Sequence, residues 1–427
     1  MKLETQCLHA GYQPESTTNS CAVPVYKTSS YVFNDTEHAA NLFGLRELGN
    51  IYTRLMNPTT DVLEQRVTAL DGGAAALGLA SGTSGVFYSI INIAQKGDEI
   101  VSANNLYGGT YTQFNDILPK FGIKVNFVDP NDPANYAAAI TDKTKALFCE
   151  TVSNPGLDVA DLEAIAKIAD DHGIPLIVDS TFSTPYLTQP IRHGASIVIH
   201  SLTKWLGGHG NGIGGVVVDS GSFNWKNGNF PLYDEPDNSY HGLRWGHDLP
   251  EPLAPLAFIL RMRTVPLRNL GACISPDNSW QFIQGIETLS LRMERHCENA
   301  LAVAKHLQGH ESVEWVRFPG LEGDPMYDLN QKYLRGKGGS MVVFGIKGGA
   351  EAGPKFIDKL ELFSHLANVG DAKSLAIHPA TTTHSQLNEE QQLAGGIKPE
   401  LVRLSIGIEH IDDILADIDH ALAEASA

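Results

Sequence analysis

Short apolar runs alternate with segments of helical length over residues 74–219. The runs lie at 74–80, 99–102, 124–128, 146–149, 175–178, 195–199 and 212–219. Strands that are apolar along their length and separated by helices are typical of a mostly parallel sheet that is covered on both faces. The sequence therefore predicts an α/β fold built around such a sheet.

Polar residues follow several of these runs, where the strands are expected to end. They are Ser81, Glu150, Asp179 and Ser201. In a sheet of this kind, ligands bind at the carboxyl ends of the strands. We therefore expect a ligand site along this edge.

Lys204 follows one of these strand ends directly, between hydroxyl residues and a glycine-rich stretch at 207–215. A lysine at the end of a strand often only extends its amine into solvent. A lysine whose pKa is lowered by burial or by a nearby cation is instead a nucleophile that forms imines with carbonyl compounds. Asp179, at the end of the preceding strand, favours the second interpretation. A pyridoxal phosphate (PLP) site needs this pair, because the lysine holds the aldehyde and the aspartate keeps the ring nitrogen protonated.

The segments Ile177–Thr181 and Ser201–Lys204 resemble the cysteine/methionine-metabolism family of PLP-dependent enzymes, and most closely its O-acetylhomoserine sulfhydrylases. The resemblance extends over nearly the whole chain. It implies the PLP-dependent transferase fold, which is aspartate-aminotransferase-like, with a large sheet domain and a smaller C-terminal α/β domain. We expect an N-terminal arm at 1–65, a PLP-binding domain at 66–265 and a C-terminal domain at 266–427.

The same resemblance implies the site residues. Lys204 would carry PLP as a covalent imine, Tyr107 would stack on the ring and act as a second acid or base, and Asn154 would lie near the phenolic oxygen. The implied cofactor-binding residues are Tyr52, Arg54, Ser81, Gly82, Thr83, Tyr107, Asn154, Asp179, Thr181, Ser201, Thr203 and Lys204. Glycine-rich turns at helix N-termini bind phosphate through free N–H groups, which suits Ser81–Thr83.

Arg403 lies inside an apolar run at 401–406. A buried guanidinium needs a partner, which is either an internal carboxylate or the carboxylate of a substrate. The planar fork of arginine suits a bidentate contact with a carboxylate. The resemblance favours the substrate, with Asn368 as the second residue at that carboxylate, where related lyases often carry serine.

Residues 1 to about 60 look irregular, and a long arm of this kind has to pack on something, such as another subunit. The Tyr52-x-Arg54 pattern resembles the family element that reaches the cofactor phosphate of a neighbouring subunit. This implies a homotetramer built from dimers with shared active sites.

Composition limits the partners. The formal net charge of -18 disfavours nucleic acid and anionic membranes. The five cysteines are scattered and contain no CxxC pair, which indicates reduced thiols in the cytoplasm. No apolar run is long enough to span a bilayer. The histidines show no metal-ligand spacing, so we expect no metal site.

The predicted reaction is γ-replacement, in which O-acetyl-L-homoserine and sulfide, or a small thiol, give L-homocysteine or a thioether, and acetate. Cystathionine γ-synthases and methionine γ-lyases share Lys204, Asp179 and Arg403 by resemblance and remain alternatives. A sulfhydrylase is favoured by Gly109, where methionine γ-lyases usually have cysteine, by Asn368, and by the long segments 220–250 and 320–338.

Two functions of other classes are weaker. A non-catalytic PLP-fold binding protein would not need the lysine, the aspartate and the arginine together. A nicotinamide-dependent oxidoreductase rests only on the glycines at 210, 212 and 215, which lead into a strand instead of opening a helix.

Overall fold

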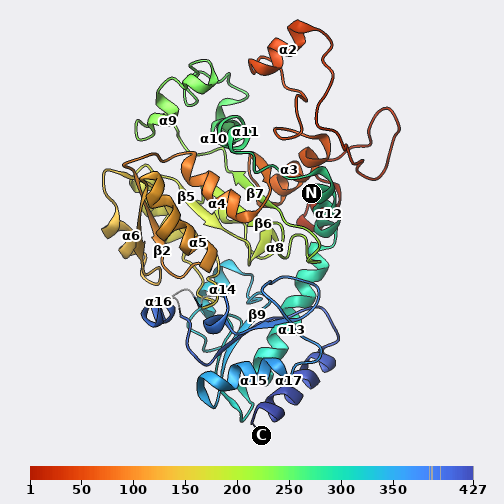
Figure 1. Ribbon diagram of the computed structural model, residues 1–427, viewed down its shortest axis with the longest axis vertical. Coiled ribbons are helices and arrows are strands. Elements are labelled where there is room, and N and C mark those ends of the chain that lie inside the picture. Colours follow the sequence, from red (N-terminus) through yellow and green to blue (C-terminus); the bar gives the residue numbers. More distant parts are fainter. Residues whose placement is uncertain (384, 386–387, 395, 427) are drawn as a thin grey trace.

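The computed structural model describes residues 1–383, 385, 388–394 and 396–426, and the chain forms two sheets (Figure 1). The larger sheet has the strand order β1-β7-β6-β5-β4-β2-β3. Its strands are β1 (Ala75–Leu79), β2 (Glu99–Ala103), β3 (Lys124–Val128), β4 (Thr144–Glu150), β5 (Leu176–Asp179), β6 (Ile197–Ser201) and β7 (Gly215–Asp219). Only β7 runs antiparallel to its neighbours. The predicted mostly parallel sheet is confirmed.

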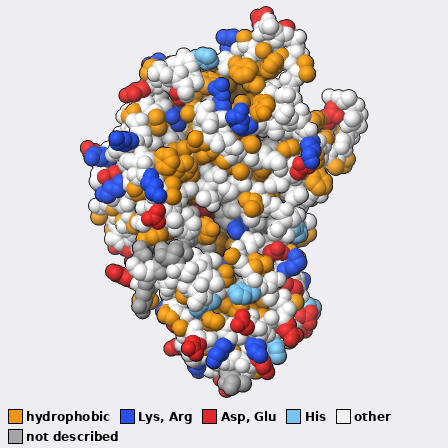
Figure 2. All heavy atoms as spheres, viewed as in Figure 1, with side chains coloured by type: hydrophobic (Ala, Val, Ile, Leu, Met, Phe, Trp, Pro, Cys, Tyr) orange, Lys and Arg blue, Asp and Glu red, His pale blue; other side chains and the backbone are white. Residues whose placement is uncertain are grey.

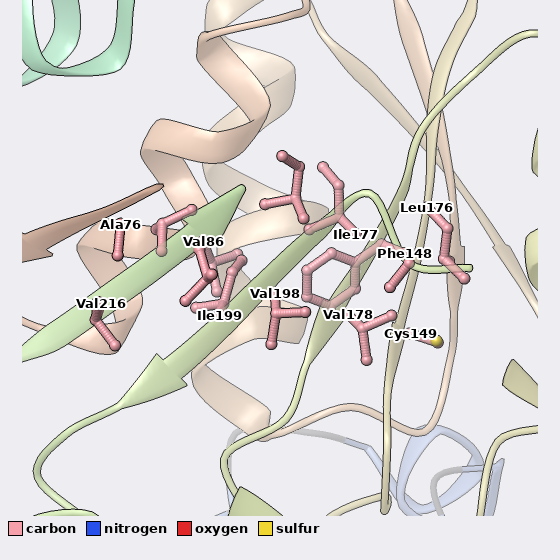
Figure 3. Packing of buried hydrophobic residues seen from close by; sticks show 14 of the residues in the cluster. Ala76, Val86, Phe148, Cys149, Leu176, Ile177, Val178, Val198, Ile199 and Val216 are labelled. Atoms are coloured by element: carbon pink, nitrogen blue, oxygen red, sulfur yellow. The ribbon is translucent and has the colours of Figure 1, made fainter. Parts of the chain in front are cut away.

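The side chains of the apolar runs form the hydrophobic core around this sheet. Figure 3 shows Phe148, Val178 and Val198 packed together, with Val86 of the helix Gly82–Ile91 beside Ile199. These side chains are buried. Burial of a Val, Ile or Phe side chain stabilises a fold by about 1.5–3 kcal/mol, which explains why the strands are apolar on both faces.

The helices begin and end where local chemistry requires. In α3, Asn57 accepts a hydrogen bond from the Thr59 N–H, Pro58 occupies the first turn, and Gly72 ends the helix with a positive φ of 74°. The helices are α1 (Leu3–His9), α2 (Thr36–Phe43), α3 (Pro58–Asp71), α4 (Gly82–Ile91), α5 (Gly108–Thr112), α6 (Ala134–Ala139), α7 (Leu162–Asp171), α8 (Thr184–Leu187), α9 (Pro231–Asp234), α10 (Ala257–Met262), α11 (Arg268–Leu270), α12 (Pro276–Glu287), α13 (Leu289–Gln308), α14 (Tyr327–Tyr333), α15 (Ala352–Asp358), α16 (Glu389–Ala394) and α17 (Ile411–Ser426).

The smaller sheet has the order β10-β11-β12-β9-β8. It forms the lower part of the molecule in Figure 1, with α13, α15 and α17 beside it. Its strands are β8 (Val313–Arg317), β9 (Met341–Ile346), β10 (Ser364–His365), β11 (Leu375–Ile377) and β12 (Leu401–Ser405). The sequence did not reveal β10 and β11, because strands of two or three residues are too short to show a pattern.

The register of the larger sheet places functional candidates at one edge. Glu150 pairs with Asp179 across β4 and β5, and Ser201 pairs with Gly215 across β6 and β7. The N-terminus of α4 comes very close to this edge, since a Cβ added at Gly82 would lie 2.8 Å from the Cβ of Ser201. Only glycine permits this approach.

One expectation needs correction. The first residues are not irregular, because α1 buries Cys7 and Ala10 accepts a hydrogen bond from Arg66. Helices α12 and α13 are separated at Thr288, whose φ of -105° and ψ of 9° are not helical. The segment 220–250 is largely loop, and an aromatic cluster packs it against α10. The cluster comprises Trp225, Phe230, Tyr233 and Phe258.

Candidate active site

A cavity of about 490 Å³ lies where the carboxyl edge of the larger sheet meets β12 and the segment before β11. The predicted residues on its wall are Ser81, Gly82, Thr83, Tyr107, Asn154, Asp179, Thr181, Ser201, Thr203, Lys204, Asn368 and Arg403. Tyr52 and Arg54 do not line it. The fold therefore brings together residues that are up to 322 positions apart, from 81 to 403.

One end of the cavity is suited to a phosphate group. Ser81 caps α4 by accepting from the Ser84 N–H at 3.0 Å, and Gly82 and Thr83 form the first turn. The N–H groups of a first helical turn have no partner within the helix and attract anions. Ser201 and Thr203 line the same wall, and the Thr203 hydroxyl accepts from the Gly214 N–H at 3.1 Å. These donors match the phosphate of PLP.

Asp179 lies at the end of β5 and is partly buried. Its Oδ1 accepts from the Thr181 N–H at 3.0 Å, and the Thr181 hydroxyl accepts from the Ser201 N–H at 2.9 Å. Burial raises the pKa of Asp179, although the hydrogen bonds from Thr181 oppose this shift. A carboxylate in such surroundings gains most from a cationic partner, such as a protonated ring nitrogen.

Lys204 carries an amine with nucleophilic character. Its Nζ donates to Asn368 Oδ1 at 2.6 Å. Burial, together with the charge of Arg403, lowers the pKa of Lys204 to about 8. A substantial fraction of the amine is then unprotonated near neutral pH, as imine formation requires.

Arg403 is buried in the middle of the smaller sheet, where it pairs with Ile377 and Val343. Its Nη1 donates to Asn154 Oδ1 at 2.8 Å, and its Nη2 donates to the Asn368 carbonyl at 3.4 Å. Burial lowers its pKa to about 10. Among the described residues, no carboxylate lies within ion-pair distance of this guanidinium. The internal-ion-pair interpretation therefore fails, and the side chain is available to an anion in the cavity.

Tyr107 is half-exposed at the start of α5, and its N–H donates to Glu150 Oε1 at 2.8 Å. Its ring covers Gly109, since a Cβ added there would lie 2.5 Å from Tyr107 Cε1. A larger residue at 109 would have to displace the ring.

Tyr52 and Arg54 lie in the arm, away from the cavity of their own chain. Arg54 Nη1 donates to the Arg268 carbonyl at 2.5 Å, and its guanidinium carbon lies 5.4 Å from the Tyr52 ring centre. Their predicted role in a neighbouring subunit stays a prediction.

The sequence interpretation gave no role to several lining residues. Glu150 shared the strand-end position that singled out Asp179, so that signal was present. The apolar lining residues Val152, Phe182, Ile213, Ala367 and Val369 gave no signal, because apolar residues are common at any buried position.

The described ranges contain no group of three or more His, Cys, Asp or Glu side chains arranged to hold a metal ion. None of the helices in the described part of the chain is long and apolar enough to cross a membrane.

Residues 4–423 match the model of the family described as Cys/Met metabolism PLP-dependent enzyme. The chain belongs to this family. Its cavity also fits the family's cofactor, because it combines a helix N-terminus for the phosphate, a lysine of lowered pKa and a strand-end aspartate of raised pKa.

Individual members of the Cys/Met metabolism family are similar over almost the full length. An O-acetyl-L-homoserine sulfhydrylase of Leptospira meyeri is 57% identical and covers 99% of this chain and 96% of its own. O-acetyl-L-homoserine sulfhydrylase 1 of Thermus thermophilus is 52% identical, covering 99% and 100%. A Campylobacter jejuni crystal structure with N'-pyridoxyl-lysine-5'-monophosphate at position 205 has a TM-score of 0.95 and 40% identity, covering 99% and 100%.

Proposed function

We propose that the protein is a PLP-dependent O-acetyl-L-homoserine sulfhydrylase. It replaces the acetate of O-acetyl-L-homoserine with sulfide, or a small thiol, to give L-homocysteine or a thioether. Full-length relatives with this name support the choice of reaction. The observation that carries the chemistry is one cavity with a lysine of lowered pKa, a partly buried aspartate and a buried arginine that has no carboxylate partner among the described residues.

Different residues would bind the aldehyde, the ring nitrogen and the phosphate of the cofactor. Lys204 would hold the aldehyde, and Asp179 would keep a proton on the ring nitrogen. Ser81, Gly82, Thr83, Ser201 and Thr203 would bind the phosphate. When bound, PLP supplies an electron-accepting ring that stabilises negative charge on the substrate.

Arg403 and Lys204 act on the substrate itself. Arg403 binds the α-carboxylate and thereby orients the Cα–H bond towards Lys204, and such orientation supplies a large part of a rate enhancement. Once the substrate amine has replaced it at the aldehyde, the Lys204 amine would take the Cα proton, since its lowered pKa lets it act as a base near neutral pH. Tyr107, which lines the same cavity, would stack on the ring and serve as the second acid or base.

Chemical trapping tests the cofactor assignment. The purified protein is reduced with borohydride and its peptides are analysed by mass. A pyridoxyl adduct on Lys204 is expected, and an adduct on another lysine, or none, contradicts the assignment. Assays with O-acetyl-homoserine, O-succinyl-homoserine and methionine, each with and without sulfide, then identify the reaction. Homocysteine formed fastest from the acetyl ester and sulfide is the expected result.

We also propose a homotetramer of dimers in which the arm completes the neighbour's site, and a cytoplasmic location, which the free thiols support. Figure 2 shows hydrophobic side chains on the surface around α2. Val32 is 97% exposed and Leu48 66%, which is typical of a surface that another chain covers. A chain carrying Tyr52→Phe and Arg54→Ala, mixed with a Lys204→Ala chain, should regain activity. No recovery would contradict the shared site.

A further inference from the structure

Glu150 is a buried carboxyl group at the end of β4, and the mechanism above does not use it. It stands in register with Asp179 on the neighbouring strand and lines the same cavity. Across the described ranges, no Lys, Arg or His side chain lies within ion-pair distance of it. Burying a carboxyl group without a cationic partner costs free energy of folding. We therefore expect the hydrogen bonds of Glu150 to have a role in the site.

Those hydrogen bonds join two loops. The Tyr107 N–H donates to Glu150 Oε1 at 2.8 Å, and the backbone N–H of Asn154 faces the same carboxyl group, where it acts to lower the pKa of Glu150. Tyr107 follows β2, whereas Asn154 follows β4. One side chain therefore anchors the backbones of two cavity loops to the sheet.

Each anchored residue contributes a side chain to the site. The Tyr107 ring lies at the cavity wall above Gly109, and Asn154 Oδ1 accepts from Arg403 Nη1 at 2.8 Å. Displacement of either loop would move the ring clamp or loosen the carboxylate-binding arginine. We infer that Glu150 is a positioning residue, whose carboxyl oxygens set the places of Tyr107 and Asn154, and through Asn154 that of Arg403.

The role needs an acceptor and does not need a charge. Burial, reinforced by the neighbouring Asp179, raises the pKa of Glu150 well above its usual value. Two carboxyl groups at adjacent strand ends do not readily both ionise, so a proton on Glu150 leaves the charge on Asp179. A neutral carboxyl group still offers its carbonyl oxygen to the two backbone N–H groups, as an amide would.

This inference rests on the proposed function. It is tested by substitutions at position 150 that keep or remove the hydrogen-bond acceptor while the volume of the side chain stays similar. Glu150→Gln keeps an acceptor, whereas Glu150→Met fills a similar volume without one, and Glu150→Ala is a second variant without an acceptor. Asp219→Leu is the matched control, because Asp219 is also a buried strand-end carboxyl group that accepts from a backbone N–H group, that of Gly221 at 2.9 Å, but it does not line the cavity.

The readouts are the visible circular dichroism band of bound PLP and the KM for O-acetyl-homoserine. Glu150→Met and Glu150→Ala should weaken the band and raise KM about 10- to 100-fold, the usual effect of removing a residue that orients site groups. Glu150→Gln should stay close to wild type. Asp219→Leu should lower the melting temperature but leave the band and KM unchanged.

Three results would overturn the inference: an unchanged band and KM in both variants without an acceptor, a loss in Glu150→Gln as large as in Glu150→Met, or an equal loss in Asp219→Leu. A wild-type protein that retains no PLP would instead contradict the proposed function, so the two failures are distinguishable.

Discussion

The two edges of the larger sheet each carry an aspartate, the partly buried Asp179 at one and the fully buried Asp219 at the other. Burial raises the pKa of both, for Asp219 to about 7. Asp179 lines the cavity together with Lys204, whereas Asp219 does not line it, and its Oδ2 has no hydrogen-bond partner within the described chain. A raised pKa therefore does not distinguish a carboxyl group that lines the cavity from one that does not.

The difference arises from topology. β7 runs antiparallel to β6, so Asp219 pairs with Ile197 at the start of β6, while Ser201 at its end pairs with Gly215. The carboxyl end of β7 thus lies at the edge where the parallel strands begin, away from their loops. Ligands bind at the carboxyl ends of parallel strands, where loops are free to form a site.

The largest expected difference is in kcat, between variants of the cavity residues Lys204 and Asp179 and a variant of Asp219. Lys204→Ala should lower kcat by about 10²–10⁴-fold, since a general base is lost. Asp179→Asn should lower it by about 10²–10³-fold, as expected for a group that stabilises developing charge electrostatically. Asp219→Asn should leave kcat close to that of the wild type. Initial rates of homocysteine formation measure all three, and similar losses for the two aspartate variants would remove the distinction between the edges.

A smaller effect is expected at the substrate carboxylate. Arg403→Lys should raise the KM for O-acetyl-homoserine, because an ammonium group cannot reproduce the bidentate fork. Arg403→Ala should cost about 2–5 kcal/mol of binding free energy, the usual cost of removing one partner of a buried charge pair. Steady-state kinetics measure both variants. Unchanged KM values would mean that Arg403 only supports Asn154.

The pKa of Lys204 predicts how the apoprotein takes up its cofactor. An amine with a pKa of about 8 is protonated below that pH and free above it, so the rate of PLP uptake should rise with pH and level off above about 8. Because the charge of Arg403 contributes to the lowered pKa, Arg403→Gln should move this midpoint upward. Stopped-flow absorbance measures the rate, and a midpoint that does not move would exclude the coupling.

The smallest effect concerns stability at the other edge. The folded pKa of Asp219, about 7, lies above the unfolded value near 3.8, so the folded state binds the proton more tightly. This carboxyl group therefore contributes stability below about pH 4, and the contribution is lost as pH rises towards 7. The loss should be on the order of 1–4 kcal/mol. Urea unfolding from pH 4 to 7 should show a flatter pH dependence for Asp219→Asn, and parallel curves would contradict the shift.

Most of the fold could be predicted from the sequence because the strands of the larger sheet are apolar runs. Strand β11 was not predicted, because three residues are too few to show a pattern. Helix α1 was not predicted either, because its burial of Cys7 depends on packing against α3 and α13. The break between α12 and α13 at Thr288 was also invisible, since the apolar pattern continues across it.

The site was predictable to the extent that it follows strand ends and local motifs. Asp179 and Lys204 follow neighbouring strands in the sequence and line the same cavity. Whether Arg403 had an internal partner could not be decided from its neighbours, because the groups around it, such as Asn154, are distant in the sequence. The same holds for Glu150, whose two backbone donors belong to separate loops.

By itself, the amino-acid sequence determined the alternation of apolar runs and helices, the lysine and aspartate at neighbouring strand ends, and the resemblance to the family, because these depend on residues near one another in the chain. Only the tertiary structure decided that Arg403 lacks a carboxylate partner among the residues it describes, that Glu150 contacts two loops, and that Asp219 lies at the opposite edge. The physical reason is that burial, pKa and the supply of hydrogen-bond partners are set by groups that folding brings together from distant parts of the chain.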